Sequence, residues 1–170
     1  MADLHAPLTF SENTQMESEL DASEKYERGL VLRKAGLFKQ AVEELEKAAT
    51  SRGHALKAYA QIGLCHTSSR RYEEAVAAFR KALTCSQAST KETVQILYVL
   101  GRTLETLGRI AETLEAYRWI RREDPDYRDV EHRIQQLSTR RVLPRGARPP
   151  QQSWVGSVLR SWQELLRLSK

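Results

Sequence analysis

The chain has 170 residues and a formal net charge of +5, and 41% of its residues are hydrophobic and 29% charged. This length allows one domain with a buried core, and the scarcity of Val-Ile-Thr alternation favours an all-α fold over a β fold. The N-terminal residues do not resemble a secretory signal, no stretch is apolar enough to span a bilayer, and two isolated cysteines suit the cytoplasm.

Residues 1–20 form the first region along the chain. They carry Asp3, Glu12, Glu17 and Glu19 and neither lysine nor arginine. We expect this region to be an acidic N-terminal tail that precedes the folded domain.

The next region, 22–125, contains an internal repeat. Three segments beginning at Ala22, Leu56 and Val94 align with one another, and Gly63 follows Gly29 by 34 residues. The same spacing separates two pairs of alanines, Ala41 and Ala75, and Ala48 and Ala82. In the third segment four more residues lie before the corresponding glycine, Gly101. The predicted units are 22–55, 56–93 and 94–125, each a pair of helices joined by a turn.

Each repeated position has a physical role. The glycines and small alanines allow the two helices of a unit to approach closely, and Gly36 and Gly108 suit a left-handed turn between them. Arg70 occupies that turn position in the second unit. A large residue in the second helix is expected to pack towards the following unit: Leu45, Phe79 and Tyr117.

With these positions in register, the segment from Ala22 to Pro125 resembles the tetratricopeptide repeat family. The resemblance implies an all-α, right-handed solenoid of helix pairs, an α-α superhelix. Tyr127, Val130, Ile134 and Leu137 then recur at helical spacing, so residues 126–139 are predicted to form a capping helix that covers the last unit.

No catalytic or metal-binding pattern is present. The four histidines lack partners at metal-ligand spacing, and glycine-rich phosphate loops and a nucleophile elbow are missing. The arginine pairs are not interleaved with stacking aromatics, which disfavours nucleic-acid binding. We therefore expect no enzyme activity, no cofactor and no metal.

Binding then has to use the surface of the array. By analogy with the family, the first helix of each unit lines a concave groove that takes a peptide or a helix of another protein. The implied groove residues are Tyr26, Leu30, Arg33, Lys34, Lys57, Leu64, Tyr98 and Arg102. The alternative for the aromatic residues is that they belong to the core or are covered by the N-terminal tail.

The last 31 residues divide into two parts. Residues 140–152 are rich in proline and arginine and predict a basic linker. Residues 153–170 place their apolar side chains on one half of a helical wheel, which predicts an amphipathic helix. Its expected contact residues are Trp154, Val158, Trp162, Leu165 and Leu166. Three destinations remain open: the chain's own array, the groove of another protein or of a second copy, and a membrane surface.

The sequence thus predicts a non-catalytic scaffold or adaptor that binds a peptide or helix in its groove. Two alternatives remain: a peripheral membrane adaptor held by the C-terminal helix at the inner face of a membrane, and a small secretion-type chaperone built on the same repeats.

Overall fold

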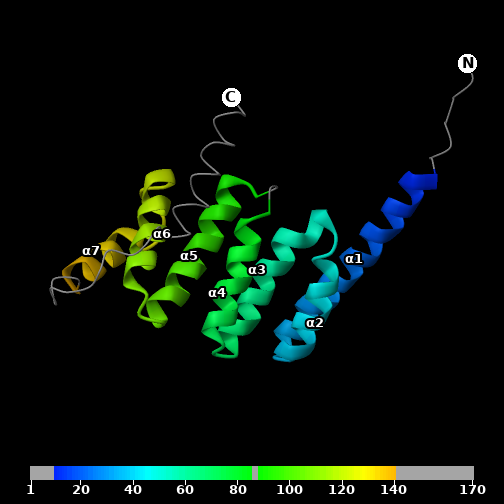
Figure 1. Cartoon of the computed structure of the whole chain (residues 1–170), viewed down its shortest axis with the longest axis horizontal. Helices are drawn as coiled ribbons and strands as arrows, with labels where there is room; N and C mark the ends of the chain where they lie inside the picture. The colour runs from blue at the N-terminus through cyan, green and yellow to red at the C-terminus, as the bar shows by residue number, and fades with distance from the viewer. Residues whose placement is uncertain (1–9, 86–87, 141–170) are drawn as a thin grey trace, which may run out of the picture.

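The structure is a computed structural model that describes residues 10–85 and 88–140. These residues form helices and no strand. In chain order the helices are α1 (Phe10–Lys34), α2 (Phe38–Ala48), α3 (Arg52–Ser68), α4 (Tyr72–Leu83), α5 (Thr90–Thr106), α6 (Ile110–Glu123) and α7 (Val130–Arg140) (Figure 1). The predicted all-α fold is confirmed.

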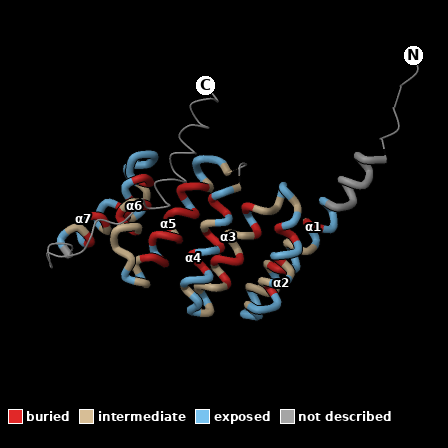
Figure 2. Tube along the Cα trace, viewed as in Figure 1, coloured by how far each residue is buried: buried red, intermediate tan, exposed pale blue. Residues whose placement is uncertain are grey.

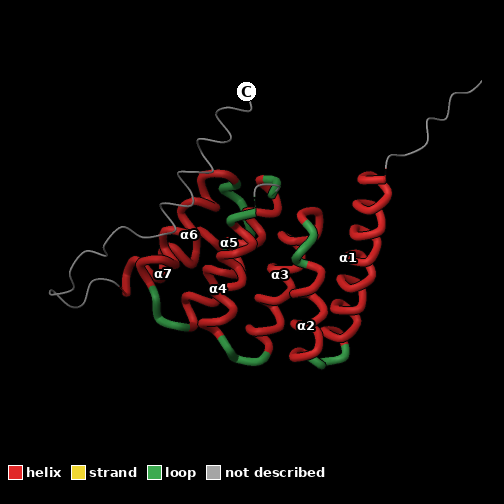
Figure 3. The backbone as a smooth tube through the Cα atoms, turned by 45° about the vertical axis from the view of Figure 1, so that its right-hand side comes forward, coloured by secondary structure: helices red, strands yellow, loops and turns green. Residues whose placement is uncertain are grey.

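The helices stack in pairs along one direction. Each of α1–α2, α3–α4 and α5–α6 packs as a hairpin, each hairpin packs on the next, and α7 packs against α6 at the far end. Short loops join neighbouring helices alternately at one edge of the array and at the opposite edge (Figure 3). This arrangement is the α-α superhelix, in which every unit contacts only its neighbours.

Helix α1 begins earlier than the sequence pattern suggested. It starts at Phe10, so residues 10–20 of the predicted acidic region are helical. This part of α1 makes a tertiary contact: the hydroxyl of Ser51 donates a hydrogen bond to Glu19 at 2.7 Å, and His54 Nδ1 lies 3.4 Å from the same carboxylate. Glu19 therefore ties the first half of α1 to the N-terminal end of α3.

Two other helices also start before the expected unit boundaries. Helix α3 starts at Arg52, four residues before Leu56, and α5 starts at Thr90, four residues before Val94. The start of α5 is fixed by a capping box: Ser89 accepts from the backbone N–H of Glu92, whose carboxylate accepts from the backbone N–H of Ser89 at 3.0 Å.

The turns within the units have the predicted left-handed backbone. Gly36 and Gly108 have φ values of 79° and 71°, and Arg70, at the same place in the second unit, has φ 59°. A residue with a Cβ is disfavoured in this conformation, so Arg70 is held there by the packing of the helices on either side.

The glycines inside the first helices are required by close packing. A Cβ on Gly29 would lie 2.6 Å from Cγ of Leu45, and one on Gly101 would lie 2.5 Å from Cε1 of Tyr117. Gly63 meets the ring of Phe79 in the same way. The large residue of each second helix thus rests on the glycine of its own unit, as well as contributing to the core beyond it.

Buried residues follow the interior of the stack (Figure 2). One large cluster joins α3 to α7 and contains Phe79, Leu97, Tyr117 and Ile134. Two smaller clusters, made mainly of small residues such as Ala41 and Ala48, join α1 and α2 to the rest. The core is therefore thicker towards the C-terminal end of the array.

Candidate functional site

The first helices of the units, α1, α3 and α5, carry the residues that the sequence assigns to the groove. Leu30 and Leu64 are half-buried, which leaves part of each side chain open to solvent. Tyr26 is also half-buried, and its ring centroid lies 5.8 Å from that of His54. Burial raises the pKa of the Tyr26 hydroxyl, so this ring is neutral and contributes apolar surface.

Four cations lie among these apolar groups: Arg33 and Lys34 on α1, Lys57 on α3, and Arg102 on α5. None of them forms an ion pair within 4 Å in the described part of the chain. Lys34, Lys57 and Arg102 are exposed, whereas Arg33 is half-buried with a buried Nε that has no hydrogen-bond partner. Arg102 makes one long contact, from Nη1 to the hydroxyl of Tyr98 at 3.4 Å.

Some cations elsewhere on the array are paired, and others, such as Lys39 and Arg118, have no ion pair among the described residues. Lys25 pairs with Asp21 on α1, Arg80 pairs with Glu112 at 2.9 Å, and Arg109 also binds Glu112. We call Arg33, Lys34, Lys57 and Arg102 the unpaired cation set. The unpaired cation set spans three successive units. Helical spacing places Arg33 and Lys34 on the same face of α1 as Leu30, and Lys57 on the same face of α3 as Leu64.

Tyr98 does not lie in an open groove. Only 7% of its surface is exposed, because the α6–α7 connection covers it. Its hydroxyl donates to Asp129 Oδ1 at 2.8 Å, the ring of Tyr127 lies edge-on at 5.6 Å, and the guanidinium of Arg128 lies 4.8 Å from its ring centre. The assignment of Tyr98 to the partner-binding surface is therefore corrected: at the third unit the chain fills this position with its own residues.

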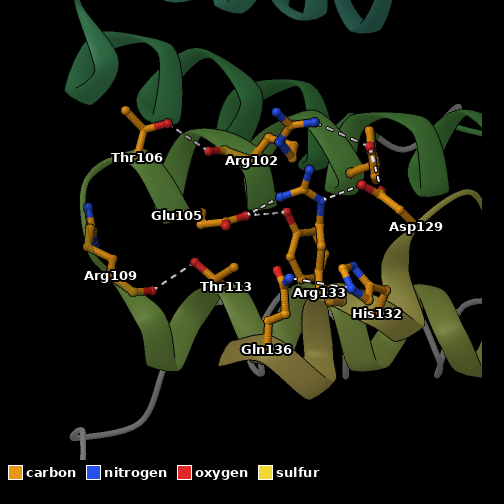
Figure 4. A network of polar contacts seen from close by, with 11 residues as sticks. Arg102, Glu105, Thr106, Arg109, Thr113, Asp129, His132, Arg133 and Gln136 are labelled. Atoms are coloured by element: carbon orange, nitrogen blue, oxygen red, sulfur yellow. Dashed lines mark hydrogen bonds and ion pairs between the residues drawn. The ribbon is translucent and has the colours of Figure 1, made fainter. Parts of the chain in front are cut away.

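A polar network continues from Tyr98 and locks α7 onto α5 (Figure 4). Arg133 donates to Glu105 at 2.8 Å and to Asp129 at 2.8 Å, and the hydroxyl of Tyr117 donates to Glu105 at 3.3 Å. Burial, followed by the charge of Glu105, raises the pKa of Tyr117 well above its ordinary value. Since each charged group in this network has a partner, we interpret it as a structural clamp.

Chemistry other than binding has little support within residues 10–85 and 88–140. They contain no group of histidine, cysteine and carboxylate side chains able to hold a metal ion. Cys65 and Cys85 are free, and burial raises the pKa of both thiols, which disfavours the reactive thiolate. No helix within this part of the chain is long and apolar enough to cross a membrane.

The predicted tail contacts fall outside the described residues. This applies to the linker from residue 141 and to Trp154, Val158, Trp162, Leu165 and Leu166.

Comparison with known proteins identifies the repeat. Residues 26–90 match the family model of the tetratricopeptide repeat. The fold is similar to the Arabidopsis OM64 TPR domain, with a TM-score of 0.62 and 17% identity over 72% of this chain and 98% of that one. It is also similar to MamA, with a TM-score of 0.60 and 16% identity over 91% of this chain and 82% of that one. No curated protein matches the sequence.

Together with the helix pairs and their glycine contacts, these matches show that the chain contains tetratricopeptide repeats and has the fold of a tetratricopeptide-repeat domain. At this level of identity the solved structures establish the fold alone. The function that this fold implies in general is a scaffold for protein–protein interaction.

Proposed function

We propose that this chain is a non-catalytic adaptor that binds an acidic, partly apolar segment of another protein along α1, α3 and α5. The observation that supports this is the unpaired cation set, which surrounds the partly exposed Leu30 and Leu64. The face of the first helices is concave in this fold and is the surface on which a peptide or a helix can be held.

The unpaired cation set indicates that the partner segment is negatively charged. Arg33 is half-buried and its Nε has no hydrogen-bond partner, so the folded chain leaves a cost of desolvation uncompensated. A carboxylate delivered by a partner would supply charge-assisted hydrogen bonds to the guanidinium group of Arg33, whose planar shape suits bidentate binding. Lys34, Lys57 and Arg102 would then extend the attraction along the bound segment.

The partner segment must also contain apolar side chains. Tyr26, Leu30 and Leu64 are each half-buried, so a partner with polar side chains alone would leave them in contact with water. Rings and aliphatic groups bordered by charge are typical of the centre of a peptide site. A segment with acidic residues at helical spacing beside leucine or phenylalanine satisfies both requirements.

The experiment is selection from a display library of random 15-residue peptides against the full chain. Selected peptides should be enriched in Asp, Glu and large apolar residues. Binding of a selected peptide should weaken at least tenfold in Arg33→Glu/Lys57→Glu and should fall steeply with salt. Neutral or basic selected peptides would refute the proposal.

A matched control variant makes the same charge reversal on the second helices of the units. Lys39 on α2 and Arg118 on α6 are exposed cations on second helices. The variant Lys39→Glu/Arg118→Glu should bind the selected peptide within about twofold of the parent chain. Equal losses in the two double variants would show that net charge, and not this face, governs binding.

A further inference from the structure

A cavity of about 380 Å³ lies between the first turns of α5 and the α6–α7 connection. Val94 and Tyr127 supply its apolar part, Lys91 and Gln95 come from α5, and Glu123 and Asp124 come from the end of α6. Tyr127 is half-buried, with the guanidinium of Arg128 5.4 Å from its ring centre and part of the side chain open to solvent. The cavity is large enough to receive a large side chain such as an indole.

The charge of this cavity differs from that of the groove. Glu123 and Asp124 are exposed and form no ion pair within 4 Å with any described residue. With Lys91 as the single cation among the lining residues, the cavity has an excess of one negative charge. A second cavity, of about 540 Å³, is bordered instead by Lys39 and Arg71 beside Leu37 and Phe38.

The chain itself contains a complementary ligand. Residues 141–170 carry six Lys and Arg side chains against the single acid Glu164, and residues 153–170 contain two of the three tryptophans. The unpaired cation set repels such a basic segment, as do the cations of the larger cavity. The acidic cavity attracts it.

The connecting chain is long enough for this contact. Helix α7 has 11 residues and is about 16 Å long, and it begins three residues after Tyr127. The 12 residues from 141 to 152 can extend over about 40 Å. The segment that follows them can therefore return along α7 to the cavity without any change in the array.

We propose that residues 153–170 of this chain dock intramolecularly on the cavity formed by Val94, Tyr127, Glu123 and Asp124. A tryptophan of the segment enters beside Val94 and Tyr127, and its arginine and lysine side chains meet the two carboxylates. This inference goes beyond the proposed function and does not depend on the identity of a partner.

The test uses the full chain labelled with 5-fluorotryptophan and measured by ¹⁹F NMR. Trp154→Phe and Trp162→Phe assign the two resonances of the segment. The chemical shift of at least one of these resonances should differ from its value in a synthetic peptide of residues 153–170. This difference should not depend on protein concentration. In the variant Glu123→Lys/Asp124→Lys this chemical-shift difference should fall by more than half.

The matched control is Glu43→Lys/Glu46→Lys, which makes the same charge change at exposed positions of α2. In this control variant the chemical-shift difference from the free peptide should stay within a tenth of its value in the parent chain. Circular dichroism checks that both double variants keep the helical content of the parent, since all four positions are exposed. An equal loss of shift in the control would overturn the proposal.

Two other results would also overturn it. A shift that grows with protein concentration would assign the segment to a second copy. Resonances that match the free peptide in buffer exclude docking. If they then move when vesicles of phosphatidylserine and phosphatidylcholine are added, the segment is a membrane-binding helix instead.

Discussion

Replacing Gly63 by alanine tests the close packing inside the second unit. The new Cβ would lie 2.6 Å from Cδ1 and 2.7 Å from Cζ of Phe79, distances that real Cβ atoms do not adopt. Phe79 is fully buried, so its ring is enclosed by the core. Helices α3 and α4 must therefore separate, or the ring must leave its preferred rotamer.

Two opposing effects set the magnitude. Forcing an extra carbon into a packed core costs about 1–3 kcal/mol, and the rigid, fully buried ring places this site at the upper end. Alanine is favoured over glycine inside a helix by about 1 kcal/mol. The net loss in the free energy of unfolding is about 2 kcal/mol, which corresponds to a fall of about 8 °C in the midpoint of thermal unfolding.

Urea unfolding followed by circular dichroism measures this loss. Gly53→Ala is the matched control, because it lies in the same helix and its Cβ would be close only to the flexible Glu19 carboxylate, at 3.2 Å, with Ser51 Oγ in ordinary contact at 3.8 Å. That variant should be as stable as the parent or slightly more stable. Combining Gly63→Ala with Phe79→Leu should cost less than the sum of the two single changes. A Gly63→Ala variant as stable as the parent, or an additive double variant, would refute the packing argument.

Three further outcomes follow from local geometry. Arg70→Gly should raise the free energy of unfolding by about 0.5–1 kcal/mol, because glycine adopts φ 59° without strain; urea titration would show no gain if the turn were unstrained. Hydrogen bonds from Ser89 hold the pKa of Glu92 below its ordinary value, so the charge of Glu92 stabilises the fold above about pH 4.3 and this contribution disappears as the pH falls further. The difference in urea midpoint between the parent and Glu92→Gln should shrink over that range, and a constant difference would contradict this. Burial, with Arg71 nearby, lowers the pKa of His66, so stability should decline as the pH falls below about 6.5. His66→Gln should remove that decline, and an unchanged pH profile would count against it.

The repeat could be predicted from the sequence because each of its steric requirements is met by one residue type at one position. Gly29, Gly63 and Gly101 face a large residue of the next helix, and no other residue type fits there. The turn glycines at positions 36 and 108 adopt a backbone that other residues avoid. Period and residue type together were therefore enough to place the helix pairs.

Other features depend on neighbours in space and leave little trace in the sequence. Glu19 on α1 accepts a hydrogen bond from Ser51, which lies 32 residues away in the sequence. Tyr98 occupies a groove position of the repeat, and only the fold of the α6–α7 connection shows that Asp129 and Tyr127 cover it. The absence of ion pairs at Arg33 and Lys57 likewise emerges only when the neighbouring helices are in place.

The clamp formed by Tyr98, Asp129, Glu105 and Arg133 makes the C-terminal end of the array more tightly held than the N-terminal end. At that end polar contacts and the large core cluster reinforce each other. At the other end α1 rests on small residues, and Leu20 and Val31 face solvent with exposed fractions of 69% and 63%. In a stack whose units contact only their neighbours, local opening starts where the coupling is weakest. Backbone amides of α1 and α2 therefore exchange their hydrogens first, and those of α5 and α6 last.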